Sequence, residues 1–167
     1  MRAFENNCFE IVTSSPAETI ALGAKIGENL VGGEIICLVG NLGSGKTHLI
    51  KGIAEGLGVD KESEVNSPTF VLVNEYTGPE VRLDIYHIDA YRLDSIAEFE
   101  MLGFDDLCYD RSVVLIEWAD KVETALESVD PIRIELAHIS ETERKIQLKN
   151  ITSELLSALQ NQVGHSR

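Results

Sequence analysis

The period with which apolar residues recur differs from one part of this chain to another, and each period predicts a different kind of secondary structure. Two runs, at residues 35–39 and 113–116, are apolar throughout, which is typical of strands buried on both faces of a sheet. Alternation begins after Pro131 and returns at residues 146–148, which favours strands with one solvated face. In that alternation one face has only aliphatic residues and the other is charged: Ile132, Ile134 and Leu136 against Arg133 and Glu135.

These patterns divide the chain into alternating strands and helices. The predicted strands lie at residues 8–12, 34–39, 70–76, 81–90, 113–116, 132–136 and 146–148. The predicted helices lie at residues 16–30, 47–57, 95–102 and 151–159. The turn residues Thr77-Gly78-Pro79 join two of the strands into an expected antiparallel pair.

The first helix has a recognisable start. Ser15 is its expected N-cap, Pro16 takes the first helical position, and Glu18 closes a capping box. The inward side chains are expected to include Ile20, Ala24 and Leu30. Gly32-Gly33 then ends the helix before the next strand.

Between the second strand and the second helix the chain reads Gly40-Asn41-Leu42-Gly43-Ser44-Gly45-Lys46-Thr47. This is the G-x-x-x-x-G-K-[ST] spacing of a phosphate-binding loop, in the strand–loop–helix context that supports it. The glycines let backbone N–H groups form a concave nest, and the helix N-terminus directs its dipole at the same anion. Lys46 would contact the β- and γ-phosphates, and the Thr47 hydroxyl would be a Mg²⁺ ligand.

Charge limits the partners of the chain. Its 167 residues contain no repeat or linker, so one domain spanning residues 1–167 is expected. The formal net charge is -14, from 14 Lys+Arg against 28 Asp+Glu. Because a free-standing nucleic-acid binder needs a basic surface, we expect any nucleic acid to reach this protein through a partner.

The spacing of the cysteines and the lack of long apolar runs indicate the cellular compartment of the protein. Cys8, Cys37 and Cys108 lie far apart without C-x-x-C spacing, which favours reduced thiols over a disulfide framework or a zinc site. The N-terminal residues lack a signal-peptide core, and no apolar run approaches the about 18 residues of a membrane span. A cytoplasmic protein with no membrane partner is expected.

Hydrolysis of a nucleotide also needs an oriented metal ion and a positioned water, and three further segments contain candidate residues for these tasks. Glu117 ends the second fully apolar strand, where it could hold Mg²⁺ through water or be an ordinary surface acid. His87 and Asp89 share a strand face, so they could position water or assist Mg²⁺, or simply be solvated. The hydroxyls of Ser67-Pro68-Thr69 could sense the γ-phosphate or belong to a plain loop. Trp118 could lie beside the nucleotide, although a core position is commoner for tryptophan.

Four separated elements together resemble the TsaE family, also called YjeE or YdiB, of small bacterial P-loop ATPases. They are Gly40 to Thr47, Ser67-Pro68-Thr69-Phe70, His87-Ile88-Asp89-Ala90-Tyr91-Arg92-Leu93 and Glu117-Trp118, and the resemblance spans residues 15–148. It implies a Mg²⁺-dependent ATPase required for threonylcarbamoyladenosine in tRNA. The protein would act with TsaB and TsaD, which transfer threonylcarbamoyl, and would sustain their turnover. Contact with tRNA would be indirect, through that complex.

The resemblance also implies site residues. Lys46, Asp89 and Glu117 would be catalytic, with Asp89 as the essential acid, and Mg²⁺ would be held by Thr47 and Glu117. Besides Lys46, the implied nucleotide contacts are Ser15, Asn41, Leu42, Gly43, Ser44, Gly45, Thr47, Thr69 and Trp118. Asn41 and Ala90 depart from the residues common in the family, at positions with no identified chemistry.

The expected fold is a three-layer α/β P-loop domain with a mixed, mostly parallel central sheet and antiparallel edge strands. Other functional classes have their own signatures. A small-molecule kinase would have an arginine-rich lid, and the arginines here are scattered. A GTPase would have an N-K-x-D element, which the sequence lacks. A nucleotide-dependent binding module without significant hydrolysis remains an alternative.

Overall fold

One mixed sheet of seven strands organises the chain in this computed structural model, which describes residues 7–66 and 72–163. The strands are β1 (Asn7–Thr13), β2 (Glu34–Val39), β3 (Val73–Tyr76), β4 (Asp84–Asp89), β5 (Ser112–Glu117), β6 (Ile132–His138) and β7 (Arg144–Ile151). Their order across the sheet is β1-β7-β6-β2-β5-β4-β3. The central strands β6, β2, β5 and β4 are parallel, whereas β1, β7 and β3 pair antiparallel. The predicted parallel centre with antiparallel edges is confirmed.

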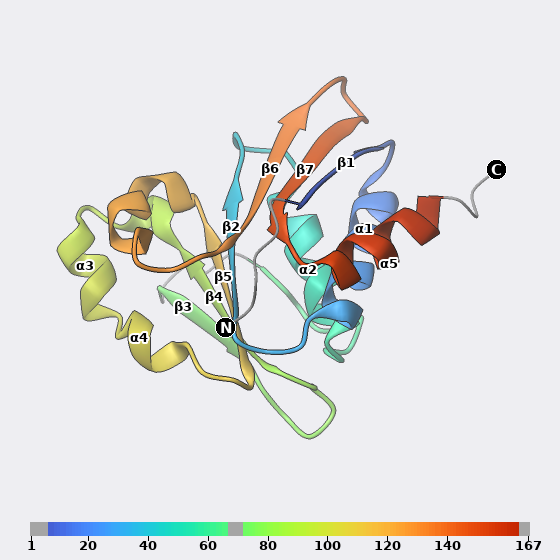
Figure 1. Ribbon diagram of the computed structural model, residues 1–167. Coiled ribbons are helices and arrows are strands. Elements are labelled where there is room, and N and C mark those ends of the chain that lie inside the picture. The colour runs from blue at the N-terminus through green and yellow to red at the C-terminus, as the bar shows by residue number, and fades with distance from the viewer. Residues whose placement is uncertain (1–6, 67–71, 164–167) are drawn as a thin grey trace.

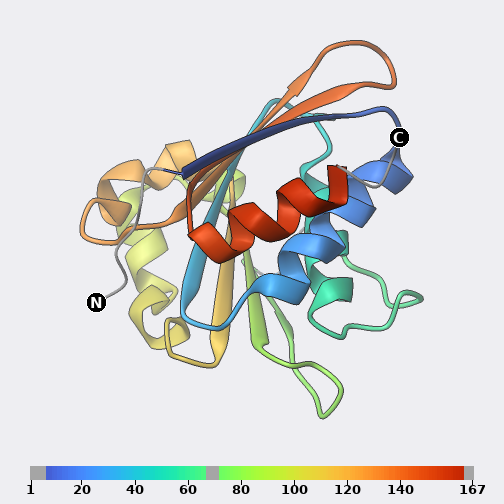
Figure 2. The same cartoon turned by 45° about the vertical axis from the view of Figure 1, so that its right-hand side comes forward.

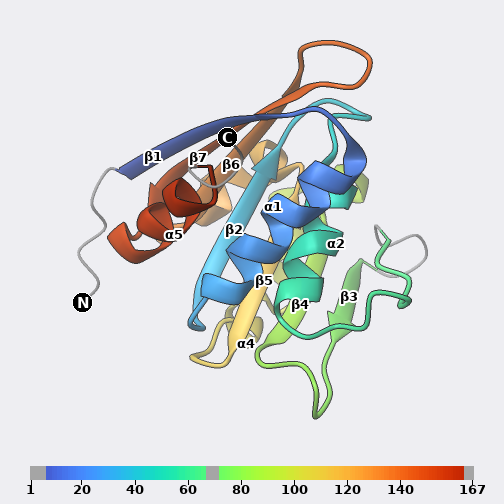
Figure 3. The same cartoon turned by 90° about the vertical axis from the view of Figure 1, so that its right-hand side faces the viewer.

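Helices cover both faces of this sheet, so the fold has the three layers expected of it (Figure 1). The helices are α1 (Pro16–Asn29), α2 (Lys46–Gly56), α3 (Ile96–Met101), α4 (Phe104–Leu107) and α5 (Ser153–Val163), with the 3-10 helices η1 (Ala90–Arg92) and η2 (Ala119–Leu126). Figure 1 shows α3 and α4 on one side of the sheet and α1, α2 and α5 on the other, and Figure 2 and Figure 3 show the latter three helices together in front of the strands. Within the described ranges, no helix has the length and apolar composition needed to cross a bilayer.

Two hydrophobic cores, one on each side of the sheet, explain the fully apolar strands. Along β5, Val113 and Leu115 belong to the core beneath α1 and α2, while Val114 and Ile116 belong to the core beneath α3 and η2. These four side chains are at most 1% exposed. Because full burial of such a side chain stabilises the fold by roughly 1.5–3 kcal/mol, the central strands are firmly held in register.

Glycines form the contact between α1 and α2. A Cβ atom on Gly23 would lie 2.4 Å from the Leu49 carbonyl oxygen, and one on Gly52 would lie 2.1 Å from the Ile20 oxygen. Real Cβ atoms essentially never approach other atoms that closely, so the two backbones can touch only where side chains are absent. This contact fixes α1 against the helix that follows the phosphate loop.

The same contact overturns part of the predicted inward face of α1. Ile20 and Ala24 are only half-buried, and of the three predicted positions only Leu30 is fully buried. The buried residues of α1 are Thr19, Leu22, Gly23, Ile26 and Gly27. The error arises because an apolar period does not count glycine, which here occupies inward positions for steric reasons.

Some element boundaries also differ from the predicted ones. The strand expected at residues 70–76 is described as Val73–Tyr76, since residues 67–71 lie outside the described chain. The strand expected at residues 81–90 is only Asp84–Asp89. It ends at Asp89 because the Asp89 carboxylate accepts the Tyr91 N–H at 3.0 Å and starts η1. The last helix begins at Ser153 rather than residue 151, because Ile151 still pairs in β7.

The N-terminus of α1 is capped nearly as predicted. The Ser15 hydroxyl accepts the Glu18 N–H at 3.1 Å, and Pro16 occupies the first helical position. The Glu18 carboxylate accepts the N–H of Ser14 at 2.6 Å, one residue before the N-cap. The predicted N-cap is therefore confirmed, whereas Glu18 accepts from the residue before the N-cap and not, as a capping box requires, from Ser15 itself.

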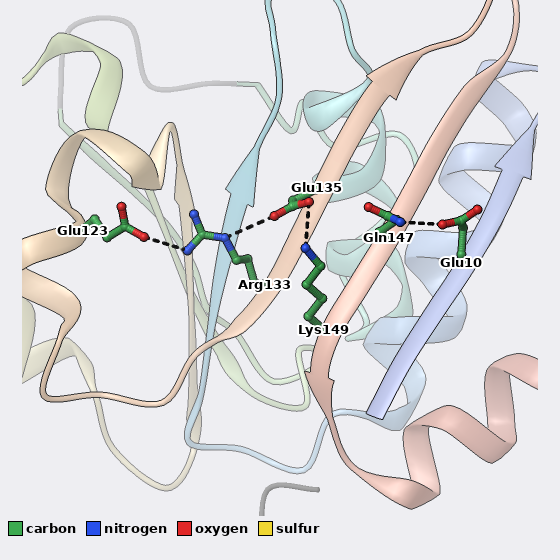
Figure 4. A network of polar contacts seen from close by, with 6 residues as sticks. All are labelled: Glu10, Glu123, Arg133, Glu135, Gln147 and Lys149. Atoms are coloured by element: carbon green, nitrogen blue, oxygen red, sulfur yellow. Dashed lines mark hydrogen bonds and ion pairs between the residues drawn. The ribbon is translucent and has the colours of Figure 1, made fainter. Parts of the chain in front are cut away.

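The polar face of β6 and β7 lies where the alternation predicts. Ile134 is fully buried, while Arg133 contacts Glu123 at 3.2 Å and Glu135 at 3.5 Å. Lys149 of β7 reaches Glu135 at 3.0 Å, which extends the network across the strands (Figure 4). Each exposed ion pair contributes about 1 kcal/mol at most. These contacts therefore add little to the stability of the two strands, whose orientation is already determined by their buried side chains.

Candidate functional site

The phosphate loop lies at the carboxyl end of β2 and leads directly into α2, beside the β6–β7 hairpin and the turn before α1 (Figure 3). Gly43 and Gly45 have φ of 76° and 101°, a left-handed backbone that favours glycine. A Cβ atom on Gly40 would lie 2.6 Å from the Leu136 carbonyl oxygen. The motif glycines are therefore required both by backbone conformation and by close packing against β6.

Lys46 is the first residue of α2 and is only 6% exposed. Its ammonium donates hydrogen bonds to the carbonyl oxygens of Gly40 and Asn41, the latter at 3.0 Å, and lies 4.2 Å from the centroid of the Trp118 ring. Burial lowers the pKa of Lys46, and the nearby Glu117 and Asp89 carboxylates oppose that shift. The cation is thus placed between its own loop, an aromatic face and two acids.

Asp89 and Glu117 lie opposite each other at the ends of neighbouring parallel strands. They are partners in the β4–β5 register and are 8% and 3% exposed. Burial raises the pKa of Asp89, and the Glu117 charge adds to the rise, whereas the Tyr91 N–H opposes it. The strand order brings both acids to the edge of the sheet where the phosphate loop begins.

His87 shares the buried face of β4 with Asp89, as the period of two predicts. Its Nε2 atom lies 2.7 Å from Glu117 Oε2, and its side chain is fully buried. The alternative of solvated charges at a strand end is therefore wrong for both His87 and Asp89.

Trp118 follows Glu117 and turns the chain out of β5 with φ 56°. A left-handed backbone costs a non-glycine residue of order 1–2 kcal/mol, and the Trp118 ring lies beside the Lys46 ammonium of the phosphate loop. The ring packs on Tyr91 with centroids 5.0 Å apart and is partly buried at the edge of the second core. Trp118 therefore combines a core contact with a position beside Lys46.

The remaining predicted site residues surround this centre to different degrees. Ser15 caps α1, and Thr19 of that helix lies 3.8 Å from a Cβ placed on Gly45, so the start of α1 adjoins the loop. Asn41, Leu42 and Thr47 are exposed around the loop, Leu42 by 87%. Thr69, expected in the switch-like loop, lies outside the described residues.

Two residues that sequence reasoning did not assign lie against the loop. His138 at the end of β6 lies 3.6 Å from a Cβ placed on Gly43, and Arg144 at the start of β7 lies 3.9 Å from one placed on Gly45. Both are about a hundred positions further along the chain, and no local motif marks them. Only the position of β6 beside β2 reveals them.

The donors of the site fit Mg²⁺ held together with a nucleotide. In the part of the chain that the structure describes, no three His, Cys, Asp or Glu side chains gather as a metal site. Mg²⁺ usually takes one or two carboxylates plus phosphate oxygens and water, rather than an all-protein cage. Glu117 and Asp89, with the Thr47 hydroxyl near the loop, match that requirement.

Comparison with known proteins places these features in a family. The model of a family described as Threonylcarbamoyl adenosine biosynthesis protein TsaE matches residues 13–146. A TsaE protein of Treponema pallidum is 36% identical over 135 residues, which are 81% of this chain and 96% of that protein. One from Bacillus subtilis is 37% identical over 134 residues, 80% of each chain.

A solved structure agrees with the sequence comparison. The crystal structure of YdiB from Bacillus subtilis superposes with a TM-score of 0.76 and 27% sequence identity, covering 99% of this chain and 100% of that one. The sheet and its helices are therefore shared over the full length.

Proposed function

Because this chain belongs to the TsaE family of tRNA threonylcarbamoyladenosine biosynthesis proteins, we propose that it binds ATP with Mg²⁺ and hydrolyses it in support of that modification. The observation that carries the proposal is the convergence of Lys46 with the buried pair Asp89 and Glu117 at the carboxyl ends of three adjacent parallel strands. Phosphate binding alone needs no acid there, whereas hydrolysis needs a group that helps to hold Mg²⁺ and one that positions the attacking water, and two buried acids can fill these tasks.

In this proposal each group has a separate task. Backbone N–H groups of residues 43–47 and the Lys46 ammonium bind and orient the phosphates. Thr47 and Glu117 would hold Mg²⁺, and the bound ion would neutralise developing phosphate charge. Asp89 orients the attacking water and accepts its proton, since its raised pKa makes it a stronger base than an exposed aspartate. Trp118 shields one side of the site from solvent.

The partners in this proposal are TsaB and TsaD, and tRNA is reached only through them. The net charge of -14 supports indirect contact, because the chain lacks the excess of cations that releases counterions from RNA. We propose that this activity takes place in the cytoplasm, where the tRNA-modification pathway after which the family is named would have access to tRNA.

Turnover measurements test the proposal. ATP hydrolysis is measured for the isolated chain and again with TsaB and TsaD, using Lys46→Ala and, as a matched control on the same helix, Lys51→Ala. We expect Lys46→Ala to lose productive nucleotide binding and Lys51→Ala to resemble the wild type. Bound nucleotide without turnover in either condition would instead indicate a nucleotide-dependent binding module.

Two further substitutions separate chemistry from binding. Glu117→Ala and Asp89→Ala should leave nucleotide affinity largely intact while reducing turnover by about 100-fold or more, the usual scale for removing a group that acts in the transition state. Wild-type turnover in either variant would remove that acid from the mechanism.

A further inference from the structure

His87 is buried beside the proposed catalytic acids, yet the proposed function assigns it no task. Its side chain is 0% exposed, and Nε2 lies 2.7 Å from Glu117 Oε2. The other ring nitrogen, Nδ1, is buried and has no hydrogen-bond partner among the described residues. Within residues 7–66 and 72–163, the polar contact of the imidazole is with Glu117.

The role proposed for Glu117 determines which nitrogen donates. A carboxylate that is to hold Mg²⁺ is ionised and only accepts hydrogen bonds, so in the 2.7 Å contact the proton lies on Nε2 of His87. Nδ1 is then left buried without a donor, which is unfavourable for folding. The nearest β5 register partner, Leu115, belongs to an apolar core that an aliphatic side chain would suit better than an imidazole. Packing alone therefore does not explain a histidine at this position.

Glu117 needs a fixed orientation for a physical reason. Asp89 lies opposite it in the strand register, and two neighbouring carboxylates repel each other in a buried site. A donor on Oε2 holds one oxygen of Glu117 and so limits rotation of the whole carboxylate. Partners that hold metal-ligating side chains from behind are a general feature of metal sites.

We propose that His87 is a positioning residue whose Nε2–H holds the Glu117 carboxylate in the orientation that faces Mg²⁺. This inference rests on the proposed function, because the orientation of Glu117 matters only if Glu117 serves the metal. It predicts a defined tautomer that exists before nucleotide or metal binds. It also predicts that loss of the donor affects Mg²⁺ use rather than binding by the phosphate loop.

The first test is spectroscopic and needs no activity. Nitrogen-15 NMR of histidine-labelled protein without nucleotide or Mg²⁺ reports which ring nitrogen of His87 is protonated, and the spectrum of His87→Gln assigns its signals. We expect a proton on Nε2 with a hydrogen-bonded resonance that disappears in Glu117→Ala. A proton on Nδ1 alone in the wild type, or the same hydrogen-bonded resonance in Glu117→Ala, would overturn the inference.

The second test compares three substitutions of His87. Glutamine places an amide N–H at about the reach of Nε2, asparagine is one methylene shorter, and leucine fills the volume without a donor. We expect His87→Leu and His87→Asn to lower kcat and raise the Mg²⁺ concentration for half-maximal turnover by about 10–100-fold. Nucleotide affinity without Mg²⁺ should stay at the wild-type value, and His87→Gln should recover most of the lost kcat.

The readouts separate the possible failures. Thermal unfolding of each variant shows that it is folded, and wild-type kcat and Mg²⁺ dependence in His87→Leu would overturn the inference. An equal loss in His87→Gln and His87→Leu would indicate a structural role and would also overturn it. If the wild type shows no turnover alone or with its partners, the proposed function fails. Binding of a non-hydrolysable ATP analogue then still tests the role of His87. Mg²⁺ should tighten this binding in the wild type, less so in His87→Leu, and again in His87→Gln.

Discussion

At the scale of single residues, burial determines how the charged groups of the site behave. Lys46 and Asp89 are both withdrawn from water, and burial shifts the pKa of each toward its uncharged form. Nearby opposite charges resist both shifts: the Glu117 and Asp89 carboxylates oppose the fall in the pKa of Lys46, and the Arg92 guanidinium opposes the rise in the pKa of Asp89. The pKa of each charged group in the site therefore depends on its charged neighbours, so removal of one charge tests its effect on the others.

Asp89→Asn should stabilise the folded protein at neutral pH while reducing hydrolysis. Since the folded pKa of Asp89 is raised above its ordinary value of 3.8, the folded state binds the proton more tightly than the unfolded state. Ionisation of Asp89 consequently costs stability at pH 7, and this cost disappears as the pH falls through the raised pKa toward 3.8. Asparagine keeps an acceptor for the Tyr91 N–H without the charge.

Chemical denaturation at a series of pH values measures this effect. The stability gain of Asp89→Asn over the wild type should be largest at pH 7 and shrink on acidification. Asp110→Asn, at an exposed position, serves as the control and should show no such pattern. A variant less stable than the wild type at pH 7 would contradict the assigned cost of ionisation.

At the scale of elements, the pairing of α1 with α2 connects the phosphate loop to the rest of the fold. α2 begins at Lys46 of the loop, and α1 begins at the Ser15 cap beside it. Glycines let the two helices touch through their backbones, so the position of the loop depends on a contact that tolerates no side chain. Substitutions far from the chemistry should therefore have large effects on stability.

Gly52→Ala should destabilise the protein, although alanine favours an isolated helix by about 1 kcal/mol over glycine. The new Cβ would lie 2.1 Å from the Ile20 carbonyl oxygen and 2.9 Å from the Gly23 Cα, so α1 and α2 must separate. We expect a loss of about 1–3 kcal/mol or more in the free energy of unfolding, measured by denaturant titration. His48→Ala at an exposed position of α2 is the control, and an unchanged midpoint for Gly52→Ala would refute the close contact.

Arg82 is a second tie between elements, at the opposite end of α1. Its guanidinium donates to the carbonyl oxygens of Leu30 at 2.7 Å and of Gly27 at 2.8 Å, at the helix C-terminus where carbonyl groups run short of intrahelical donors. Arg82→Gln should lower the free energy of unfolding by about 1–2 kcal/mol, because charge-assisted hydrogen bonds to the helix end are lost. Arg111→Gln, another exposed arginine, should change it by much less, and equal effects would exclude a capping role.

At the scale of the whole molecule, net charge determines which partners can be approached directly. The value of -14 repels a polyanion, although charges beyond a Debye length of about 8 Å are mostly screened in physiological salt. The nucleotide site can still attract ATP, since its cation and loop N–H groups act over short distances. The acidic chain has no comparable group of cations that would attract tRNA over a long distance.

The isolated chain should therefore fail to shift tRNA in a native gel at physiological salt. Adding TsaB and TsaD should produce a shifted complex that contains the chain, if contact is indirect as proposed. The same assay at low salt controls for weak electrostatic binding, which screening would hide. Tight, salt-sensitive binding of tRNA by the chain alone would overturn this expectation.

Local signals in the sequence determined much of this protein. The phosphate loop is contiguous, and its glycines, lysine and threonine need only the strand before it and the helix after it to be recognised. The fully apolar and alternating strands were predicted correctly because burial on two faces or one leaves a different period. The Ser15 cap was likewise visible because capping is a contact between near neighbours.

Only the tertiary structure decided which distant groups meet. The register that sets Asp89 opposite Glu117, the contact of His87 with Glu117, and the approach of His138 and Arg144 to the loop all follow from strand order. Strand order depends on how whole faces pack, and no local pattern in a single sequence encodes it. For the same reason the glycine contact of α1 with α2 was missed, since a residue without a side chain leaves no trace in a hydrophobic period.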